Sequence, residues 1–196
     1  MSKKKPERPL PQSLALPFAG ADSHAHLDHE GLLPDLTGML QRAAESGVSL
    51  IVHMFLQHSR YAANRQLILD AASALENGPD ICFVRGLHPE DVLEADETEW
   101  ENLVHAVKND PRIRAIGEIG LDYYYDLSER SVQREVFEKQ LILAKEYDVP
   151  FILHERDATG DCLDILRRFY KGGRLRTLPG VCNCCSCSLE ASQELI

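Results

Sequence analysis

Two histidines separated by one residue, His24 and His26, stand at the end of a short apolar segment. Residues two apart in an extended strand point to the same side, so both imidazoles are expected to project toward one point. Two converging imidazoles are natural ligands for a borderline divalent metal ion. Two histidines that are satisfied within a polar turn would show the same spacing. The pair alone does not decide between these interpretations.

Three further polar residues end apolar segments, namely His88, Glu118 and His154. Glu118 lies inside an apolar stretch, where an unpaired carboxylate costs free energy that a bound metal ion would remove. The carboxyl ends of the strands of a barrel share one rim, where active sites lie. Separate strands that bring such groups to one rim favour a functional site over chance. We therefore predict a metal site formed by His24, His26, Glu118 and His154.

The secondary-structure elements that must position these residues can be predicted from two sequence patterns that alternate along the chain. Short apolar runs typical of buried strands alternate with longer segments of helical spacing. The expected strands are Ala21–His24, Val48–Met54, Ile81–Gly86, Ala115–Ile119, Val149–His154 and Gly180–Cys184. This alternation predicts an α/β fold with a parallel sheet, either open and doubly wound or closed into a barrel. The Gly-x-Gly-x-x-Gly turn of a dinucleotide-binding fold is absent after the first strand.

Apolar stripes backed by charge predict the helices between the strands, as expected for helices that lie on a sheet. The stripes are Leu36, Met39, Leu40 and Ala43; Leu67, Ala71, Ala74 and Leu75; Trp100, Leu103, Val104 and Val107; Val132, Val136, Phe137, Leu141 and Ala144; and Leu163, Leu166, Phe169 and Tyr170.

The composition, with 44% hydrophobic and 27% charged residues in a chain of 196, is that of an ordinary soluble domain. Residues 1–19 are rich in lysine and proline and predict a flexible leader, followed by one domain over residues 20–196. No apolar run resembles a membrane span or a signal peptide, so we expect a cytoplasmic protein. The formal net charge of −10 argues against a surface that coats nucleic acid. It does not exclude nucleic acid bound locally at a metal centre, and no obligate protein partner is indicated.

Three motifs in order resemble the signatures of the TatD family of metal-dependent hydrolases, namely Asp22–Asp28, Gly117–Tyr123 and Pro150–Asp157. Gly86–Pro89 and the helix around Gln140 also match, so the resemblance runs from about Gly20 to the end of the chain. It implies a TIM-type (β/α)8 barrel, of which about six β/α units are present. It also implies two divalent metal ions, with zinc, magnesium and manganese not distinguished. The implied activity is phosphodiester hydrolysis, with nucleic acid as substrate and a deoxyribonuclease of the 3′-to-5′ exonuclease type.

The resemblance also implies a role for each ligand. His24 and His26 hold one metal ion and Glu118 bridges both ions. His154 binds the second ion, which makes Glu118 and His154 the catalytic candidates. A water molecule activated by the ions would then attack the phosphorus atom of the substrate.

Weaker candidates lie near these ligands. His88 and Arg156 are expected to contact a phosphate, although either could equally support a neighbour or lie on the surface. Tyr123–Tyr125 follow Glu118 and could stack on a base. Packing within a loop is at least as good an expectation for two of these three tyrosines.

Two departures from the family pattern favour an alternative. Asn183, another weak candidate, stands where the family has a histidine, and an amide oxygen binds zinc-like metals more weakly than imidazole. The chain ends at Ile196, whereas a full barrel runs to roughly 250 residues. The alternative is a truncated, degenerate family member with weak metal binding and little or no catalysis, prone to aggregate through its open sheet edges. An interaction module that reuses part of the barrel is a third reading.

Four cysteines crowd into the last strand, namely Cys182, Cys184, Cys185 and Cys187. They are too close for the spacing of a zinc ribbon, and on a strand they would face opposite sides in pairs. We therefore expect no metal clamp there. Cys82 and Cys162 lie in apolar patterns and are expected to be buried free thiols.

Overall fold

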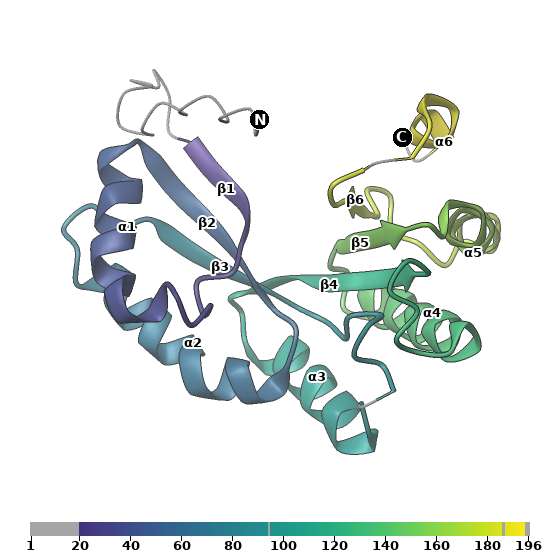
Figure 1. Cartoon of the computed structure of the whole chain (residues 1–196), viewed down its shortest axis with the longest axis horizontal. Helices are drawn as coiled ribbons and strands as arrows, with labels where there is room; N and C mark the ends of the chain where they lie inside the picture. The colour runs from purple at the N-terminus through teal and green to yellow at the C-terminus, as the bar shows by residue number, and fades with distance from the viewer. Residues whose placement is uncertain (1–19, 94, 186, 195–196) are drawn as a thin grey trace, which may run out of the picture. The chain divides into compact units, whose positions relative to one another are not determined.

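Strands and helices alternate along the computed structural model, which describes residues 20–93, 95–185 and 187–194 (Figure 1). The predicted leader, residues 1–19, lies outside the described residues. The strands are β1 (Gly20–Ala25), β2 (Val48–Phe55), β3 (Asp80–Arg85), β4 (Ile113–Asp122), β5 (Phe151–Arg156) and β6 (Gly180–Cys182). The helices are η2 (Leu33–Asp35), α1 (Leu36–Glu45), α2 (His58–Ser73), α3 (Glu97–Asn109), α4 (Arg130–Glu146), α5 (Thr159–Lys171) and α6 (Leu189–Glu194). Within the described ranges, none of these helices has the length and apolar character that crossing a membrane requires.

The strands form one sheet of six in the order β1-β2-β3-β4-β5-β6. The pairs β1–β2, β3–β4, β4–β5 and β5–β6 are parallel. A doubly wound sheet would reverse its strand order at a switch point, and this order does not reverse. The predicted fold class is therefore confirmed, because this topology is that of the first six β/α units of a TIM-type barrel.

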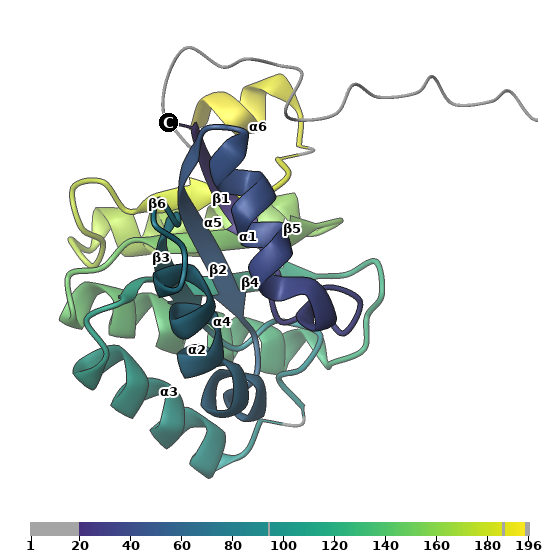
Figure 2. The same cartoon turned by 90° about the vertical axis from the view of Figure 1, so that its left-hand side faces the viewer.

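The chain divides into two compact units, Met1–His53 with Ala63–Cys82 and Met54–Ala62 with Phe83–Ile196. The prediction of a single domain over residues 20–196 stays a prediction. In the first unit, α1 runs beside β2 in both Figure 1 and Figure 2. Leu40 of α1 is fully buried in the core of this unit, and Ile51 of β2 is also buried there.

Part of the predicted buried stripe of α2 is wrong, although Ala71 is buried as predicted. Leu67 is 49% exposed, whereas Ile68 is fully buried. The helix ends at Ser73, before the predicted Ala74 and Leu75. One residue turns an α-helix by about 100°, so the adjacent residues Leu67 and Ile68 lie on different sides of α2.

The second unit holds the main apolar core, which lies between the sheet and its helices. Helix α4 packs on β4 and α5 packs on β5. The core includes Ile116 and Ile119 of β4, Phe137 and Leu141 of α4, and Phe169 of α5. The predicted apolar faces of α4 and α5 therefore point into the core, except that Tyr170, at the end of the predicted α5 stripe, is 76% exposed.

Two glutamines of α4 pair with the backbone at the ends of two strands. Gln133 accepts the N–H of Asp122 over 2.9 Å and donates to the carbonyl of Asp122 over 3.1 Å. Gln140 does the same for Leu87, over 2.8 and 3.0 Å. Both side chains are buried. The amides thus satisfy backbone groups that no strand neighbour reaches.

We expect Gln140→Leu to destabilise the protein. Each buried backbone group left without a partner costs about 1–3 kcal/mol, so the free energy of unfolding should fall by roughly 2–4 kcal/mol. Urea unfolding measures this change. The matched control is Gln41→Leu, at an exposed position on α1 where the amide binds only Glu45, and it should have an effect of about 0.5 kcal/mol or less. Equal losses from both substitutions would contradict the role given to Gln140.

A buried histidine of β2 holds the loop that follows β1. The N–H of Leu27 donates to Nδ1 of His53 over 3.0 Å, and Nε2 of His53 lies 3.8 Å from Asp28. Burial lowers the pKa of His53 from its ordinary value to about 4. The ring is therefore neutral in the folded protein at pH 7.

Acid should destabilise the fold through His53. The unfolded chain takes up the proton below a pH of about 6.5, and the folded ring resists it until about pH 4. The stabilisation is complete above the unfolded pKa and is lost as the pH falls toward 4, by up to about 3 kcal/mol. His53→Asn keeps an acceptor for Leu27 but cannot titrate, so urea unfolding between pH 7 and 4 should depend less on pH. A His53→Asn variant as acid-sensitive as the wild type would contradict the assignment.

Candidate metal centre

The end of β1 brings the first two predicted ligands together. Nε2 of His24 and Nε2 of His26 lie 3.2 Å apart. Two zinc–nitrogen bonds of about 2.0–2.1 Å at a tetrahedral angle would place two nitrogen atoms about 3.3 Å apart. Asp22 accepts the backbone N–H of His24 over 3.1 Å. Within the first unit, both imidazoles therefore project toward one point, at a spacing that suits a shared ion.

A second group of donors, Glu118, His154 and His88, lies in the second unit. Nδ1 of His154 is 3.6 Å from Oε2 of Glu118 and 3.2 Å from Nε2 of His88. The three donor atoms all lie within 4.8 Å of one another. Glu118 and His88 are buried, and convergent nitrogen and oxygen donors of this kind suit a divalent cation. That this group and the histidine pair of the first unit belong to one centre stays a prediction.

Asp122, which the sequence analysis did not single out, orients His154. Its Oδ2 lies 2.9 Å from Nε2 of His154, and its Oδ1 accepts the N–H groups of Tyr124 and Tyr125. Burial opposes the charged form of Asp122, but the N–H groups of Tyr125 and Tyr124 and the ring of His154 outweigh it and lower the pKa of this carboxyl. Oδ2 can only accept, so Nε2 of His154 carries the proton and the lone pair of Nδ1 faces Glu118. The signal in the sequence was a second carboxylate four residues after Glu118.

The charge state of His154 follows from the same neighbours. Burial alone would lower its pKa, but Glu118 and Asp122 accept hydrogen bonds from the protonated ring and outweigh burial, so the pKa is raised. A histidine between two carboxylates therefore lies in a negative environment that favours a proton or a cation.

His88 turns an N–H group toward His154. The backbone N–H of Glu90 donates to Nδ1 of His88 over 3.3 Å. Nδ1 is then the acceptor of the ring, and Nε2 carries the proton that points to Nδ1 of His154, 3.2 Å away. In this tautomer His88 presents a hydrogen-bond donor at the site, and its role as a phosphate contact stays a prediction.

Asn183 contacts Glu118 through its NH₂ group. Nδ2 of Asn183 donates to Oε2 of Glu118 over 3.0 Å, and the backbone N–H of Asn183 donates to the carbonyl of Leu153. The side chain expected to replace a metal ligand therefore presents a donor and fixes one oxygen of Glu118.

A glycine of the second motif is required by the approach of β4 to β5. Gly120 has a φ of +143°, and a Cβ there would lie 2.0 Å from the carbonyl oxygen of His154. Any other residue would push the two strands apart at this point. The spacing of Glu118, Gly120 and Asp122 thus combines two carboxylates of the candidate site with a backbone position that only glycine can occupy.

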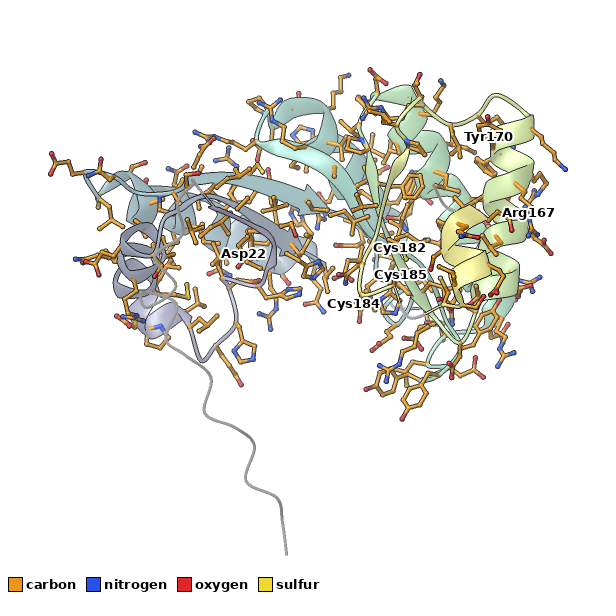
Figure 3. All side chains as sticks on the ribbon, turned by 90° about the horizontal axis from the view of Figure 1, so that it is seen from above. Asp22, Arg167, Tyr170, Cys182, Cys184 and Cys185 are labelled. Carbon is orange, nitrogen blue, oxygen red and sulfur yellow. The ribbon has the colours of Figure 1, made fainter. Side chains whose placement is uncertain are left out.

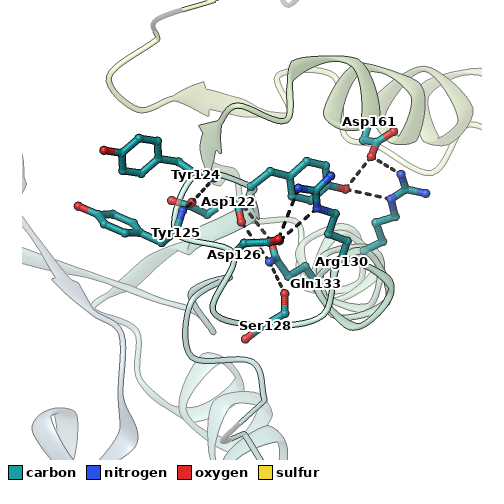
Figure 4. Close-up of polar contacts among 10 residues, drawn as sticks. Asp122, Tyr124, Tyr125, Asp126, Ser128, Arg130, Gln133 and Asp161 are labelled. Carbon is teal, nitrogen blue, oxygen red and sulfur yellow. Dashed lines mark hydrogen bonds and ion pairs between the residues drawn. The ribbon is translucent and has the colours of Figure 1, made fainter.

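The three tyrosines after Asp122 have different surroundings (Figure 4). The hydroxyl of Tyr123 donates to Asp161 over 2.6 Å, and the ring packs against the apolar core. Tyr124 and Tyr125 are exposed. The guanidinium of Arg156 lies over both exposed rings, 4.0 and 4.7 Å from their centroids.

Of the four clustered cysteines, Cys182 lies in the sheet and Cys184, Cys185 and Cys187 follow it. Strand β6 ends at Cys182, so the predicted strand to Cys184 is too long and the thiols do not alternate across it. Sγ of Cys185 and Sγ of Cys187 are 3.1 Å apart, and Figure 3 shows Cys182, Cys184 and Cys185 at this end of the chain. Among the residues that the structure describes, no group of three cysteines is close enough to hold a metal ion.

Comparisons with known proteins show which family the chain resembles. The model of TatD-related DNases matches residues 21–196. The metal-dependent hydrolase YabD of Bacillus subtilis, itself uncharacterized, is 34% identical over 88% of this chain and 63% of its own. The 3′-5′ ssDNA/RNA exonuclease TatD of Citrobacter koseri is 30% identical over 89% of this chain and 63% of its own. The crystal structure of YjjV, a TatD homolog from Escherichia coli, superposes with a TM-score of 0.73 at 30% identity, over 89% of this chain and 63% of that one.

The chain thus spans less than two thirds of the length of these relatives. The matched segment includes every motif described above, from the histidine pair to Asn183. The resemblance in motifs, the family match and the shared topology agree, and the chain belongs to the TatD-related DNase family of metal-dependent hydrolases.

Proposed function

We propose that this chain provides the ligands of a two-metal centre that hydrolyses phosphodiesters. His24 and His26 hold one divalent ion, Glu118 bridges both, and His154 holds the second. The observation that carries the proposal is the pair formed by buried Glu118 and half-buried His154, in which each ligand has a second partner that fixes it. Imidazole nitrogens outnumber carboxylates among these ligands, which favours borderline ions such as zinc over magnesium.

The residues of the second unit have separate tasks in this proposal. Divalent ions, when bound, lower the pKa of a water molecule and polarise the phosphoryl oxygens of the substrate. Asp122 keeps the Nδ1 lone pair of His154 turned toward Glu118. Asn183 holds Oε2 of Glu118. His88 supplies an N–H group for a phosphoryl or leaving oxygen.

The proposed substrate is nucleic acid, cut from its 3′ end by a deoxyribonuclease-like activity in the cytoplasm. The activity of the Citrobacter koseri relative supports this choice. The net charge of −10 implies that the strand is held locally and not by a broad basic surface.

A second candidate is a family member that binds metal weakly and catalyses little. One observation favours it, because Asn183 offers an NH₂ group to Glu118 and leaves the second ion without the family's additional imidazole. Isothermal titration of zinc or manganese into the full chain separates the candidates. Tight binding of two ions per chain excludes the second candidate, and weak binding excludes the first.

Cleavage should depend on added metal. We expect the full chain to cleave labelled single-stranded DNA with zinc or manganese and to lose this activity in EDTA, because the described site offers no other activated nucleophile. Glu118→Gln should lower the rate by more than the roughly 10–100-fold typical of a group that only supports a ligand. Glu135→Gln, which changes an exposed partner of Lys139 on α4, should have no effect. Undiminished cleavage in EDTA would exclude the metal mechanism.

Asp122→Asn should weaken metal binding without unfolding the protein. The new NH₂ group would face Nε2 of His154, move the ring proton to Nδ1 and block the lone pair that faces Glu118. We expect zinc affinity, measured by isothermal titration, to fall about 10–100-fold. Asp126→Asn, in the same loop but bound to exposed Arg130, should leave the affinity unchanged. Equal affinities in the two variants would show that Asp122 does not set the ring of His154.

A further inference from the structure

Two large aromatic rings lie in solvent beside the candidate metal centre. Tyr124 is 57% exposed and Tyr125 is 51% exposed. Their ring centroids are 4.9 Å apart and the planes meet at 83°. Exposed apolar area of this kind, next to a site, usually marks a binding surface.

The backbone beneath these rings is held firmly. The N–H groups of Tyr124 and Tyr125 donate to Oδ1 of Asp122 over 3.0 and 2.9 Å. Gln133 in turn pairs with the backbone of Asp122. Figure 4 shows both rings pointing away from these contacts. Rigid backbone with exposed rings is a preorganised surface, so little entropy is lost when a ligand stacks on it.

A cation completes the surface. The guanidinium of Arg156 lies over both rings, and in the part of the chain that the structure describes it forms no ion pair with a carboxylate. Arg156 lies opposite Asp122 in the pairing of β5 with β4. It is two residues beyond His154, about 6–7 Å along the strand and on the same face of the sheet.

We infer that Tyr124, Tyr125 and Arg156 form a platform for one unpaired nucleobase and its phosphate. The rings supply a stacking surface that accepts any base. The guanidinium supplies the charge that complements a phosphate. A base within a duplex is already stacked and paired, so the platform selects a single-stranded end. The inference rests on the proposed hydrolysis of nucleic acid.

Fluorescence anisotropy of labelled oligonucleotides tests the platform in EDTA, where no cleavage occurs. The double variant Tyr124→Ala with Tyr125→Ala should bind a single strand at least about 10-fold more weakly than the wild type. It should bind an abasic strand of equal length as the wild type does, because that strand has nothing to stack. The variant Tyr124→Phe with Tyr125→Phe keeps the rings and should bind both strands normally.

Two further variants separate stacking from charge. Arg156→Ala should weaken binding of both strands. Tyr170→Ala removes a ring that is 76% exposed on α5 and projects from its surface (Figure 3), and it should change neither affinity. Circular dichroism confirms that each variant is folded.

Three outcomes would overturn the platform. These are equal losses on base-containing and abasic strands, duplex binding as tight as single-strand binding, and no measurable binding of the wild type to the base-containing strand. If the chain binds base-containing strands as expected but shows no metal-dependent cleavage, the proposed hydrolysis is refuted and the platform is still supported.

Discussion

Strands β3 and β4 end while their backbones are still buried, and buried N–H and C=O groups must be paired. Gln133 and Gln140 of α4 meet this requirement, each with one acceptor and one donor for a single backbone residue. The two glutamines are seven residues apart, which is two helical turns, so they lie on one buried face of α4. Their partners adjoin the site, because Leu87 precedes His88 and Asp122 binds His154. One helix therefore fixes the strand ends that present the polar groups.

The requirement that buried polar groups be paired also applies to the side chains of Glu118, Asp122 and His154. Glu118 and Asp122 are both buried, and neither would be stable as an isolated charge. Asp122 accepts two backbone N–H groups, Glu118 accepts the amide of Asn183, and His154 lies between the two carboxylates. These contacts lower the pKa of Asp122 and raise the pKa of His154. A proton on His154 and the proposed divalent cation would both be stabilised by this negative environment, so acid is expected to compete with metal.

The sequence was sufficient where the governing pattern is local. Apolar runs and helical stripes predicted every strand and the first five helices, because periods of two and 3.6 residues follow directly from backbone geometry. Leu67 shows where such patterns fail: an error of one residue in placing the buried face of a helix exchanges an exposed position for a buried one. The partners of Asp122 and Asn183 could not be read from spacing, because they depend on register between strands 32 and 65 residues apart in sequence. His53 gave a signal, a histidine within an apolar strand, but its partner Leu27 lies 26 residues away.

The proposed hydrolysis of nucleic acid requires an acidic protein to bind a polyanion, which poses a specific problem of recognition. A net charge of −10 repels the strand as a whole, and at physiological salt this repulsion is screened beyond about 8 Å. Binding must therefore come from short-range contacts. Stacking is one such contact, because it needs no net charge and depends little on salt, and a cation on the same surface adds a contact that works only at close range. The arrangement of Arg156 over Tyr124 and Tyr125 combines both in one place. Local recognition of an exposed strand end is thus compatible with a negative surface elsewhere, whereas wrapping a duplex is not.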